Sequence, residues 1–184
     1  MKIGLFLGSF DPPHIGHLYV ATACVNNNLV DRVIFVPTVQ NPDKKDSTDF
    51  EHRFAMLSAM TDNHKEFYVS DIETLLTAPY YSYKTIKAIK ELYPNDELFL
   101  IVGDDIDVNT WKNGQEILDN VNIIIFERFG ITKMDYDYYI HPSFPISSTE
   151  VRNLIKQNKI ISPYVTDLVN KYINIHNLYY EQEF

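Results

Sequence analysis

The N-terminal stretch MKIGLFLGSFDPPHIGH most constrains the fold, because an apolar run gives way at once to small and rigid residues. Ile3 to Leu7 is apolar without alternation, which is typical of a strand buried on both faces of a parallel sheet. Gly8 and Ser9 end this run, and small residues there allow a ligand to approach the backbone N–H groups. We therefore expect a buried parallel strand that leads into a ligand-binding turn.

Two histidines follow this turn at a spacing that suggests a shared task. Asp11 and two prolines make the turn rigid, and His14 and His17 flank Gly16. We expect a helix to begin near residues 17 and 18, and a helix N-terminus favours anions. Two imidazoles that face one point there predict a triphosphate site. The alternative is that the histidines only cap the helix and pack.

Strand and helix patterns alternate along the rest of the chain. They predict one α/β domain, residues 1–184, with a doubly wound, Rossmann-like parallel sheet, helices on both faces and a small helical C-terminal part. Ligands bind such sheets beyond the C-terminal ends of the strands, at the topological switch point. We expect the loops after the strands that end at Gly8 and Gly103 to lie there. The expected strands are 3–7, 32–37, 98–103 and 122–126, with an extended segment at 67–72, and the expected helices are 18–27, 50–60, 82–92, 115–118, 147–157 and 163–173.

Composition narrows the classes of partner. A net charge of −9 argues against a broad basic surface, so we expect no nucleic acid as partner. The single cysteine, Cys24, permits no internal disulfide, lies in the apolar pattern of the first helix as a packing residue and suits a reducing compartment. The sequence shows no signal peptide or membrane-spanning run, so we expect a cytoplasmic protein without a membrane partner. A homo-oligomer is compatible with these observations, which do not define the oligomeric state.

The second strong motif is ISSTEVR, residues 146–152. Ser147 followed by Glu150 three residues later is the pattern of a capping box, which is the purely structural interpretation. Arg152 lies one turn after Ser148, so its guanidinium can reach the same end of the helix as the hydroxyl groups. Hydroxyls, helix dipole and arginine together predict a second anion-binding site.

Both motifs match one known family. GSFDPPHIGH resembles the pattern G-[TS]-F-D-P-x-H-x-G-H of bacterial nicotinate mononucleotide adenylyltransferases, which belong to the nucleotidylyltransferase superfamily, and ISSTEVR resembles their I-S-S-T-x-[IV]-R motif. The resemblance implies transfer of the adenylyl group of ATP to nicotinate mononucleotide, giving nicotinate adenine dinucleotide and pyrophosphate in NAD biosynthesis. It implies that the catalytic residues are His14, His17 and Arg152, and that ATP is bound by Gly8, Ser9, Phe10, Gly103, Asp105, Ser147, Ser148 and Thr149.

The middle of the chain bears on the second substrate. Residues 78–85, APYYSYKT, resemble the family's P-S-Y-T-x-x-T, which implies that backbone amides of Tyr81 and Ser82 receive the nicotinate carboxylate, although Tyr80 replaces the usual serine. A helix N-terminus prefers a carboxylate to a neutral amide. Trp111 resembles the tryptophan that stacks on the pyridine ring, with a Gly-to-Trp spacing two residues shorter than usual; core packing is the alternative.

Two further positions match the family less closely. Residues 41–45, NPDKK, stand where the family has P-P-H-K, which implies that Lys45, or less favourably Lys44, reaches the substrate phosphate; a solvated charged loop is the alternative. Arg128 stands in the family's R-P-G and either assists the phosphates or pairs with an acid. We expect Asp104 to be solvated.

No residues suited to covalent catalysis or to a dedicated metal site stand out in the sequence. Nucleotidyl transfer requires mainly alignment and charge neutralisation. We expect Mg²⁺ to be carried on ATP with most of its waters, and Asp11 to cap its turn rather than bind the metal through water. The alternatives are an adenylyltransferase for nicotinamide mononucleotide or for both mononucleotides, a phosphopantetheine adenylyltransferase, which residues 79–85 and Trp111 disfavour, and a catalytically silent nucleotide-binding protein of the same fold.

Overall fold

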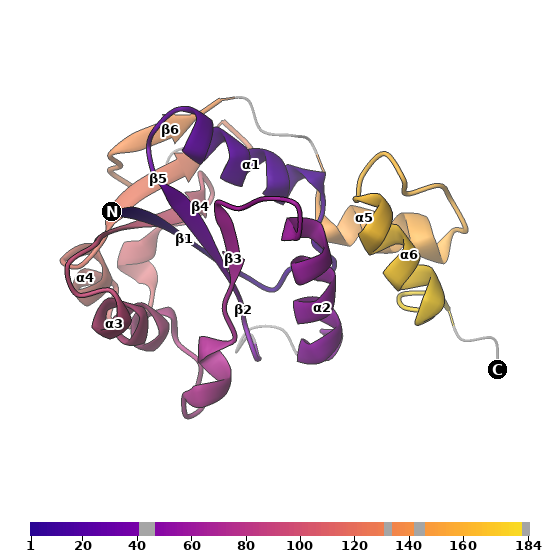
Figure 1. The fold of residues 1–184 in the computed structure, drawn as a ribbon, viewed down its shortest axis with the longest axis horizontal. Helices are drawn as coiled ribbons and strands as arrows, with labels where there is room; N and C mark the ends of the chain where they lie inside the picture. Colours follow the sequence, from indigo (N-terminus) through magenta and orange to yellow (C-terminus); the bar gives the residue numbers. More distant parts are fainter. Residues whose placement is uncertain (41–46, 131–133, 142–145, 182–184) are drawn as a thin grey trace.

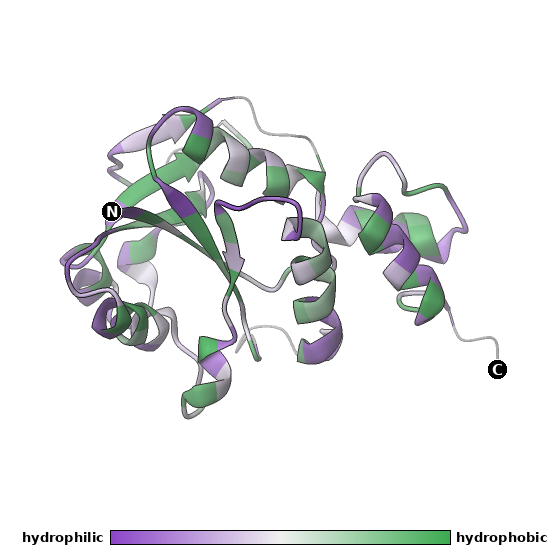
Figure 2. Cartoon of the chain, viewed as in Figure 1, coloured by the Kyte–Doolittle hydropathy of each residue, from purple (hydrophilic) through white to green (hydrophobic). Residues whose placement is uncertain are grey.

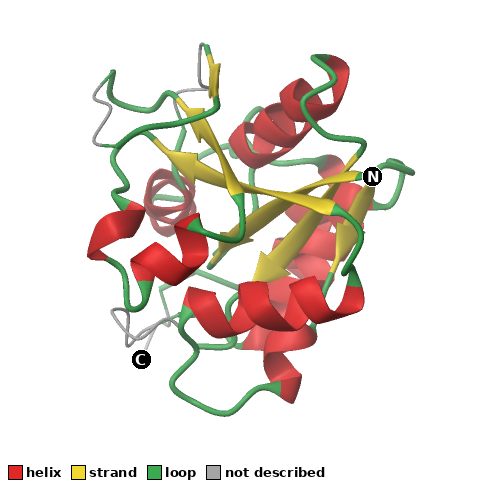
Figure 3. Cartoon of the chain, turned by 90° about the vertical axis from the view of Figure 1, so that its left-hand side faces the viewer, coloured by secondary structure: helices red, strands yellow, loops and turns green. Residues whose placement is uncertain are grey.

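The computed structural model describes residues 1–40, 47–130, 134–141 and 146–181. Within them, six parallel strands form one sheet in the order β3-β2-β1-β4-β5-β6 (Figures 1 and 3). β1 lies between β2 and β4, with Leu5 opposite both Ile34 and Leu100, so the topological switch point lies between β1 and β4. The strands are β1 (Lys2–Gly8), β2 (Arg32–Pro37), β3 (Phe67–Val69), β4 (Glu97–Gly103), β5 (Asn122–Phe126) and β6 (Tyr138–Ile140).

Helices cover both faces of this sheet (Figure 1). α1 and α2 pack on one face, where α5 and α6 extend the same apolar layer, and α3 and α4 pack on the other face. The helices are α1 (Ile15–Asn26), α2 (Phe50–Thr61), α3 (Ser82–Leu92), α4 (Gly114–Leu118), α5 (Ser148–Lys156) and α6 (Asp167–Ile175), with short 3₁₀ turns η1 (Ile72–Leu75) and η2 (Val108–Thr110).

The apolar runs of the strands explain these two layers. Successive side chains of a strand point to opposite faces, so Leu5 packs with the α3 and α4 layer and Phe6 with the α1 and α2 layer. Figure 2 shows the hydrophobic strands at the centre and helices with one hydrophobic and one hydrophilic side. Cys24 is fully buried in the α1 layer and is not in a disulfide, which confirms its packing role. None of the helices in the described part of the chain has the length and apolar character needed to cross a membrane.

The expected fold class is confirmed, and several boundaries need correction. α1 begins at Ile15 rather than near residue 17, because His14 is already the extended residue that precedes the helix and its carbonyl accepts from the N–H of His17 at 3.0 Å. The extended segment 67–72 is a strand only to Val69, after which η1 begins. The last helix begins at Asp167 rather than at residue 163, since the Thr166 side chain caps it, and β6 was not predicted.

Candidate active site

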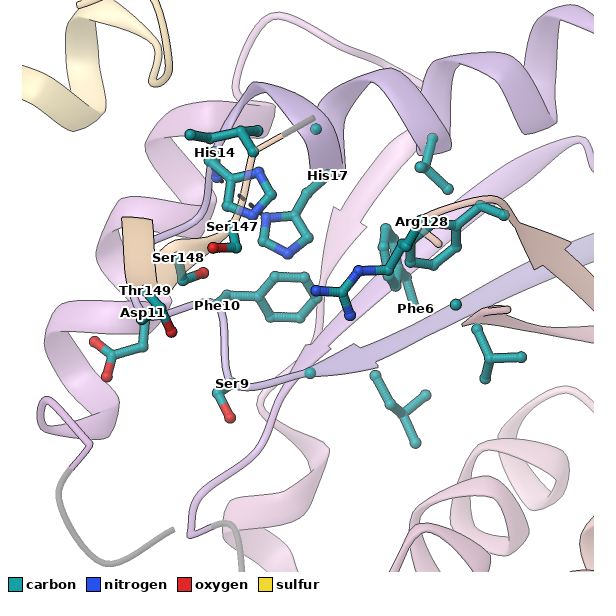
Figure 4. A pocket seen from close by; sticks show the side chains of 18 of the residues that line it. Phe6, Ser9, Phe10, Asp11, His14, His17, Arg128, Ser147, Ser148 and Thr149 are labelled. Atoms are coloured by element: carbon teal, nitrogen blue, oxygen red, sulfur yellow. Dashed lines mark hydrogen bonds between the residues drawn. The ribbon is translucent and has the colours of Figure 1, made fainter. Parts of the chain in front are cut away.

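A cavity of about 680 Å³ lies at the C-terminal ends of β1 and β4, next to the switch point. It lies between the turn after β1, the start of α1, the loop after β4 and the start of α5, and Figure 4 shows it from close by. The structure brings most of the predicted site residues together in its wall, namely Gly8, Ser9, Phe10, His14, His17, Gly103, Trp111, Ser147, Ser148, Thr149 and Arg152.

His14 and His17 stand side by side in this wall (Figure 4). Their rings stack at 3.7 Å between centroids, with an angle of 27° between the planes. The backbone N–H of His14 donates to Nδ1 of His17 at 3.1 Å. An imidazole nitrogen that accepts a hydrogen bond carries no proton, so a neutral His17 carries its proton on Nε2. His17 is thus prepared to donate a hydrogen bond from Nε2.

Both imidazoles are held in the neutral form. Burial, followed by the nearby positive charge of Arg128, lowers the pKa of His14 to about 3. Burial also lowers the pKa of His17 well below its ordinary value of 6.5, with smaller contributions from His14 and Arg128. Nδ1 of His14 is buried and has no hydrogen-bond partner among the described residues, so nothing there offsets the desolvation of a charged ring. Near pH 7 the pair therefore acts as neutral hydrogen-bonding groups.

Gly16 makes the close packing of the histidines possible. A Cβ at this position would lie 2.9 Å from Nδ1 of His14 and 3.2 Å from Cγ2 of Ile146. A side chain there would force the His14 ring or the start of the ISSTEVR motif to move. The glycine between the histidines is thus required by close approach.

The two motifs predicted to bind anions are hydrogen-bonded to each other, although the bonded residues lie 136 positions apart in the chain. The Ser148 hydroxyl donates to the carbonyl of Pro12 at 2.8 Å. Nη1 of Arg152 donates to the carbonyl of Asp11 at 2.6 Å, and Nη2 donates to Thr149 Oγ1 at 3.2 Å. The guanidinium therefore lies at the N-terminal end of α5 beside the hydroxyl groups, as the sequence predicts.

Ser147 has the structural role that its spacing suggests. Its side chain accepts from the N–H of Glu150 at 3.2 Å, which caps α5. This satisfies one of the four N–H groups that a helix leaves free at its start. Ser147 also lines the cavity, so capping and ligand contact are compatible at this position.

The segment after β5 places the positive charge of Arg128 at the cavity, and Asp104 in the loop after β4 holds this segment in place. Asp104 is fully buried, and its carboxylate accepts from the N–H groups of Arg128 at 3.0 Å and Phe129 at 3.1 Å. The expectation of a solvated Asp104 is therefore wrong, because this carboxylate fixes the backbone of the segment after β5. Arg128 pairs with Asp105 at 3.6 Å, and its guanidinium also extends toward Phe10 in the cavity (Figure 4). Gly103 permits this arrangement, since a Cβ there would lie 2.6 Å from Asp105 Oδ1.

The residues predicted for the second substrate are only partly brought to the cavity. Trp111 lines the cavity and also packs against the core on the α3 side. Tyr81 and Ser82 lie at the start of α3, outside the cavity wall. Asp105, which was predicted to bind ATP, follows β4 and also lies outside the wall. In this structure the N–H of Tyr81 donates to the carbonyl of Pro79 at 3.0 Å. Lys45, with the loop 41–46, lies outside the described residues.

Sequence reasoning assigned no role to Arg53, although this buried side chain organises the loops around the cavity. It projects from α2, is only 1% exposed, and burial lowers its pKa. It donates to four backbone carbonyls, those of Thr48 (2.7 Å), Ser9 (2.8 Å), Thr38 (2.7 Å) and Val39 (3.2 Å). A signal existed in the sequence, because Arg53 lies on the same helical face as Met56, Leu57 and Met60, which are all buried.

Glu73 continues this buried network to the other face of the sheet. It is 1% exposed and accepts from the N–H of Val39 at 2.9 Å and from the Thr85 hydroxyl at 2.8 Å. Burial raises its pKa. Because Thr85 lies in the first turns of α3, Glu73 connects the loop after β2 with the helix start that carries Ser82.

Comparison with known proteins gives one consistent result. Residues 5–154 match the cytidylyltransferase-like family. A probable nicotinate-nucleotide adenylyltransferase of Flavobacterium johnsoniae is 36% identical over 191 residues, covering 97% of this chain and 99% of the relative. A probable nicotinate-nucleotide adenylyltransferase of Thermus thermophilus is 35% identical over 185 residues, covering 97% of this chain and 100% of the relative. A solved structure of Plasmodium falciparum nicotinic acid mononucleotide adenylyltransferase, complexed with NaAD, superimposes with a TM-score of 0.79 at 27% identity and covers 97% of each chain.

Proposed function

This chain belongs to the cytidylyltransferase-like family and, within it, to the nicotinate-nucleotide adenylyltransferases, and we propose that its cavity joins ATP to nicotinate mononucleotide. The products are nicotinate adenine dinucleotide and pyrophosphate. The proposal rests on one observation. Two neutral histidines and the N-terminal end of α5, with Arg152, lie together at one cavity beside the switch point.

The reaction is an in-line displacement at phosphorus. An oxygen of the mononucleotide 5′-phosphate attacks the α-phosphorus of ATP, and the bond from that phosphorus to the bridging oxygen of the β-phosphate breaks. Such a transfer needs little covalent help, and positioned donors supply most of the acceleration. We assign Nε2–H of His17 to the phosphate oxygens whose charge grows in the transition state, and His14 to the same group of oxygens. Neutral donors fit this task because they need no proton uptake before binding.

The leaving pyrophosphate requires positive charge and free N–H groups. The N-terminus of α5 offers its dipole, and Arg152 offers a guanidinium at the same place. We assign the β- and γ-phosphates to this end, with Ser147, Ser148 and Thr149 around them. The rest of ATP would be bordered by Gly8, Ser9, Phe10 and the loop 103–105.

Magnesium would arrive with ATP, held by phosphate oxygens and water. The fit of the protein to a dedicated metal is poor, because both carboxylate oxygens of Asp11 already accept hydrogen bonds from protein groups. Among the described residues, these bonds connect the Asp11 carboxylate to Thr48 and Tyr179 rather than to its own turn, which corrects the expectation of a turn cap. The described residues hold no group of three or more His, Cys, Asp or Glu side chains arranged for a metal ion.

The nicotinate end is assigned to the start of α3 and to Trp111. The N–H of Ser82 belongs to the first turn of α3, where N–H groups have no partner within the helix. A carboxylate accepts from such donors with both oxygens, whereas a carboxamide must turn its NH₂ toward them. Leaving one buried group unpaired costs about 1–3 kcal/mol. Lys45 is assigned to the mononucleotide phosphate.

The deciding experiment is competition between the two mononucleotides. The purified protein is given ATP with nicotinate and nicotinamide mononucleotide at equal concentration, and both dinucleotide products and pyrophosphate are measured. We expect a preference for the acid in kcat/KM of at least about tenfold, and up to about 10⁴-fold. Comparable rates would indicate a dual-specificity enzyme. ATP binding without release of pyrophosphate from ATP in the presence of either mononucleotide would indicate a silent nucleotide-binding protein.

A further inference from the structure

We propose that Tyr179, in the segment after α6, is a positioning residue for the triphosphate end of the site. This inference rests on the proposed function for the identity of the ligand. Tyr179 lies outside residues 5–154, the part of the chain that matches the family. The C-terminal segment thus supports a site whose other parts come from the α/β core.

The first step of the argument is the contact between Tyr179 and Asp11, two residues 168 positions apart. The Tyr179 hydroxyl donates to Oδ1 of Asp11 at 2.7 Å, and the N–H of Thr48 donates to Oδ2 at 3.2 Å. Asp11 is only 6% exposed. Burial, followed by the negative charge of Asp11, raises the pKa of Tyr179, so its hydroxyl remains protonated and donates to the carboxylate. A charge-assisted hydrogen bond of this kind is stronger than a neutral one.

The second step leads from Asp11 to the proposed phosphate-binding group. The backbone carbonyl of Asp11 accepts from Nη1 of Arg152 at 2.6 Å, and the next carbonyl, of Pro12, accepts from Ser148 at 2.8 Å. Asp11 is therefore held at its carboxylate by Tyr179 and at its carbonyl by Arg152. Loss of the Tyr179 hydroxyl would leave the carboxylate with only its bond from the N–H of Thr48 and loosen the carbonyl that fixes the guanidinium.

The backbone of Tyr179 gives independent support. Its φ is +68°, in the left-handed region that bulky side chains rarely adopt. Such a conformation is energetically unfavourable and persists where contacts with the surrounding structure hold it in place. The hydroxyl contact to Asp11 and the packing of Tyr179 against the α1 and α2 core are the contacts that hold it here.

The competing explanation is that Tyr179 only anchors the C-terminal segment. The neighbouring tyrosine separates the two explanations, because the Tyr180 hydroxyl donates at 2.6 Å to Oδ1 of Asn174, a residue of α6, in an exposed hydrogen bond. Tyr180→Phe removes one hydroxyl and one hydrogen bond from this segment without touching Asp11. It is therefore the matched control for Tyr179→Phe.

The experiment measures steady-state kinetics of both variants with ATP and nicotinate mononucleotide, together with inhibition by pyrophosphate. For Tyr179→Phe we expect kcat/KM for ATP to fall about tenfold and the inhibition constant of pyrophosphate to rise by a similar factor, the size expected for one hydrogen bond to a charged group. The KM for the mononucleotide should stay within about twofold of the parent, a split that a general loss of structure would not produce. Tyr180→Phe should match the parent in all three quantities.

A double-mutant cycle with Asp11→Ala tests the path of the effect. If Tyr179 acts through Asp11, Tyr179→Phe should cause no further loss in the Asp11→Ala background. The proposal is overturned if Tyr179→Phe stays within about twofold of the parent for ATP, if Tyr180→Phe shows the same loss, or if the two substitutions are additive.

Direct binding separates this inference from the proposed function. A parent protein that turns over neither mononucleotide would overturn the proposed function alone. Calorimetry with a non-hydrolysable ATP analogue would then decide the role of Tyr179. About tenfold weaker binding by Tyr179→Phe than by Tyr180→Phe would support it, and equal binding would overturn it.

Discussion

His14 gives this protein a pH-dependent stability that one substitution should remove. The folded state holds its pKa at about 3, chiefly through burial, while an unfolded histidine titrates near 6.5. Between these two values the unfolded chain binds a proton that the folded chain does not bind. The contribution of His14 to stability is therefore fully present above about pH 6.5 and is lost as the pH falls below that value.

The size of the effect follows from the two pKa values. Between pH 7.5 and 5.5 the folded state takes up no proton at His14, and the unfolded state goes from mostly neutral to mostly protonated. Linkage then predicts a loss of about 1.4 kcal/mol from this group. Burial, the main cause of the lowered pKa of His17, is the same in both proteins that are compared, so the contribution of His17 largely cancels in the difference. His14→Asn is the suitable variant, because asparagine is favourable at the residue that precedes a helix.

The assay is urea unfolding of the parent and of His14→Asn at pH 7.5 and pH 5.5, at constant ionic strength. The parent should lose about 1.4 kcal/mol more than the variant on going to the lower pH. Equal losses, within the uncertainty of about 0.5 kcal/mol that applies to such comparisons, would mean that folded His14 is protonated. That result would refute the assignment of a neutral imidazole pair.

Three further substitutions test other parts of the site. His17→Ala should lower kcat by about 10²–10³-fold, as for loss of one preorganised donor, with a far smaller change in KM for ATP; activity within a few-fold of the parent would contradict this role. Trp111→Ala should weaken mononucleotide binding by about 1–3 kcal/mol and leave ATP binding nearly unchanged. If adding the mononucleotide leaves the Trp111 fluorescence unchanged and the variant loses thermal stability, Trp111 is a packing residue. Arg53→Met should cost at least about 3 kcal/mol in urea unfolding, because four carbonyls lose a donor and each unpaired buried acceptor costs about 1–3 kcal/mol; a loss below about 1 kcal/mol would show that the loops rearrange to satisfy them.

The sequence predicted the elements whose signals are local. The helix 82–92 and the strand 122–126 were predicted to the residue, because their apolar periodicity ends at clear breaks in the pattern. The start of α1 was misplaced because an imidazole is not among the usual helix-capping side chains, so His14 gave no recognisable signal. β6 is only three residues long and, within the described part of the chain, pairs with β5 alone, so it leaves little periodicity to detect.

The sequence could not predict the buried polar network, because its partners are set by tertiary structure. Arg53 bonds to Ser9, 44 residues away, and Glu73 bonds to Val39, 34 residues away. Asp104 and Asp105 illustrate the limit most directly. They are identical neighbours, yet one is fully buried on two backbone N–H groups and the other forms a half-exposed pair with Arg128.

The electrostatics of the cavity explains how an acidic protein can bind a triphosphate. The chain carries a net charge of −9, so the positive charge must be local. The neutral histidines do not supply it, and among the described residues the positive charges in the cavity wall come from Arg128 and Arg152, beside the acidic Asp11 and Glu150. The histidines can stay neutral beside Arg128 because a charged imidazole there would be both desolvated and repelled. In the proposed mechanism the arginines therefore match the charge of the phosphates, and the histidines provide oriented donors that carry no net charge.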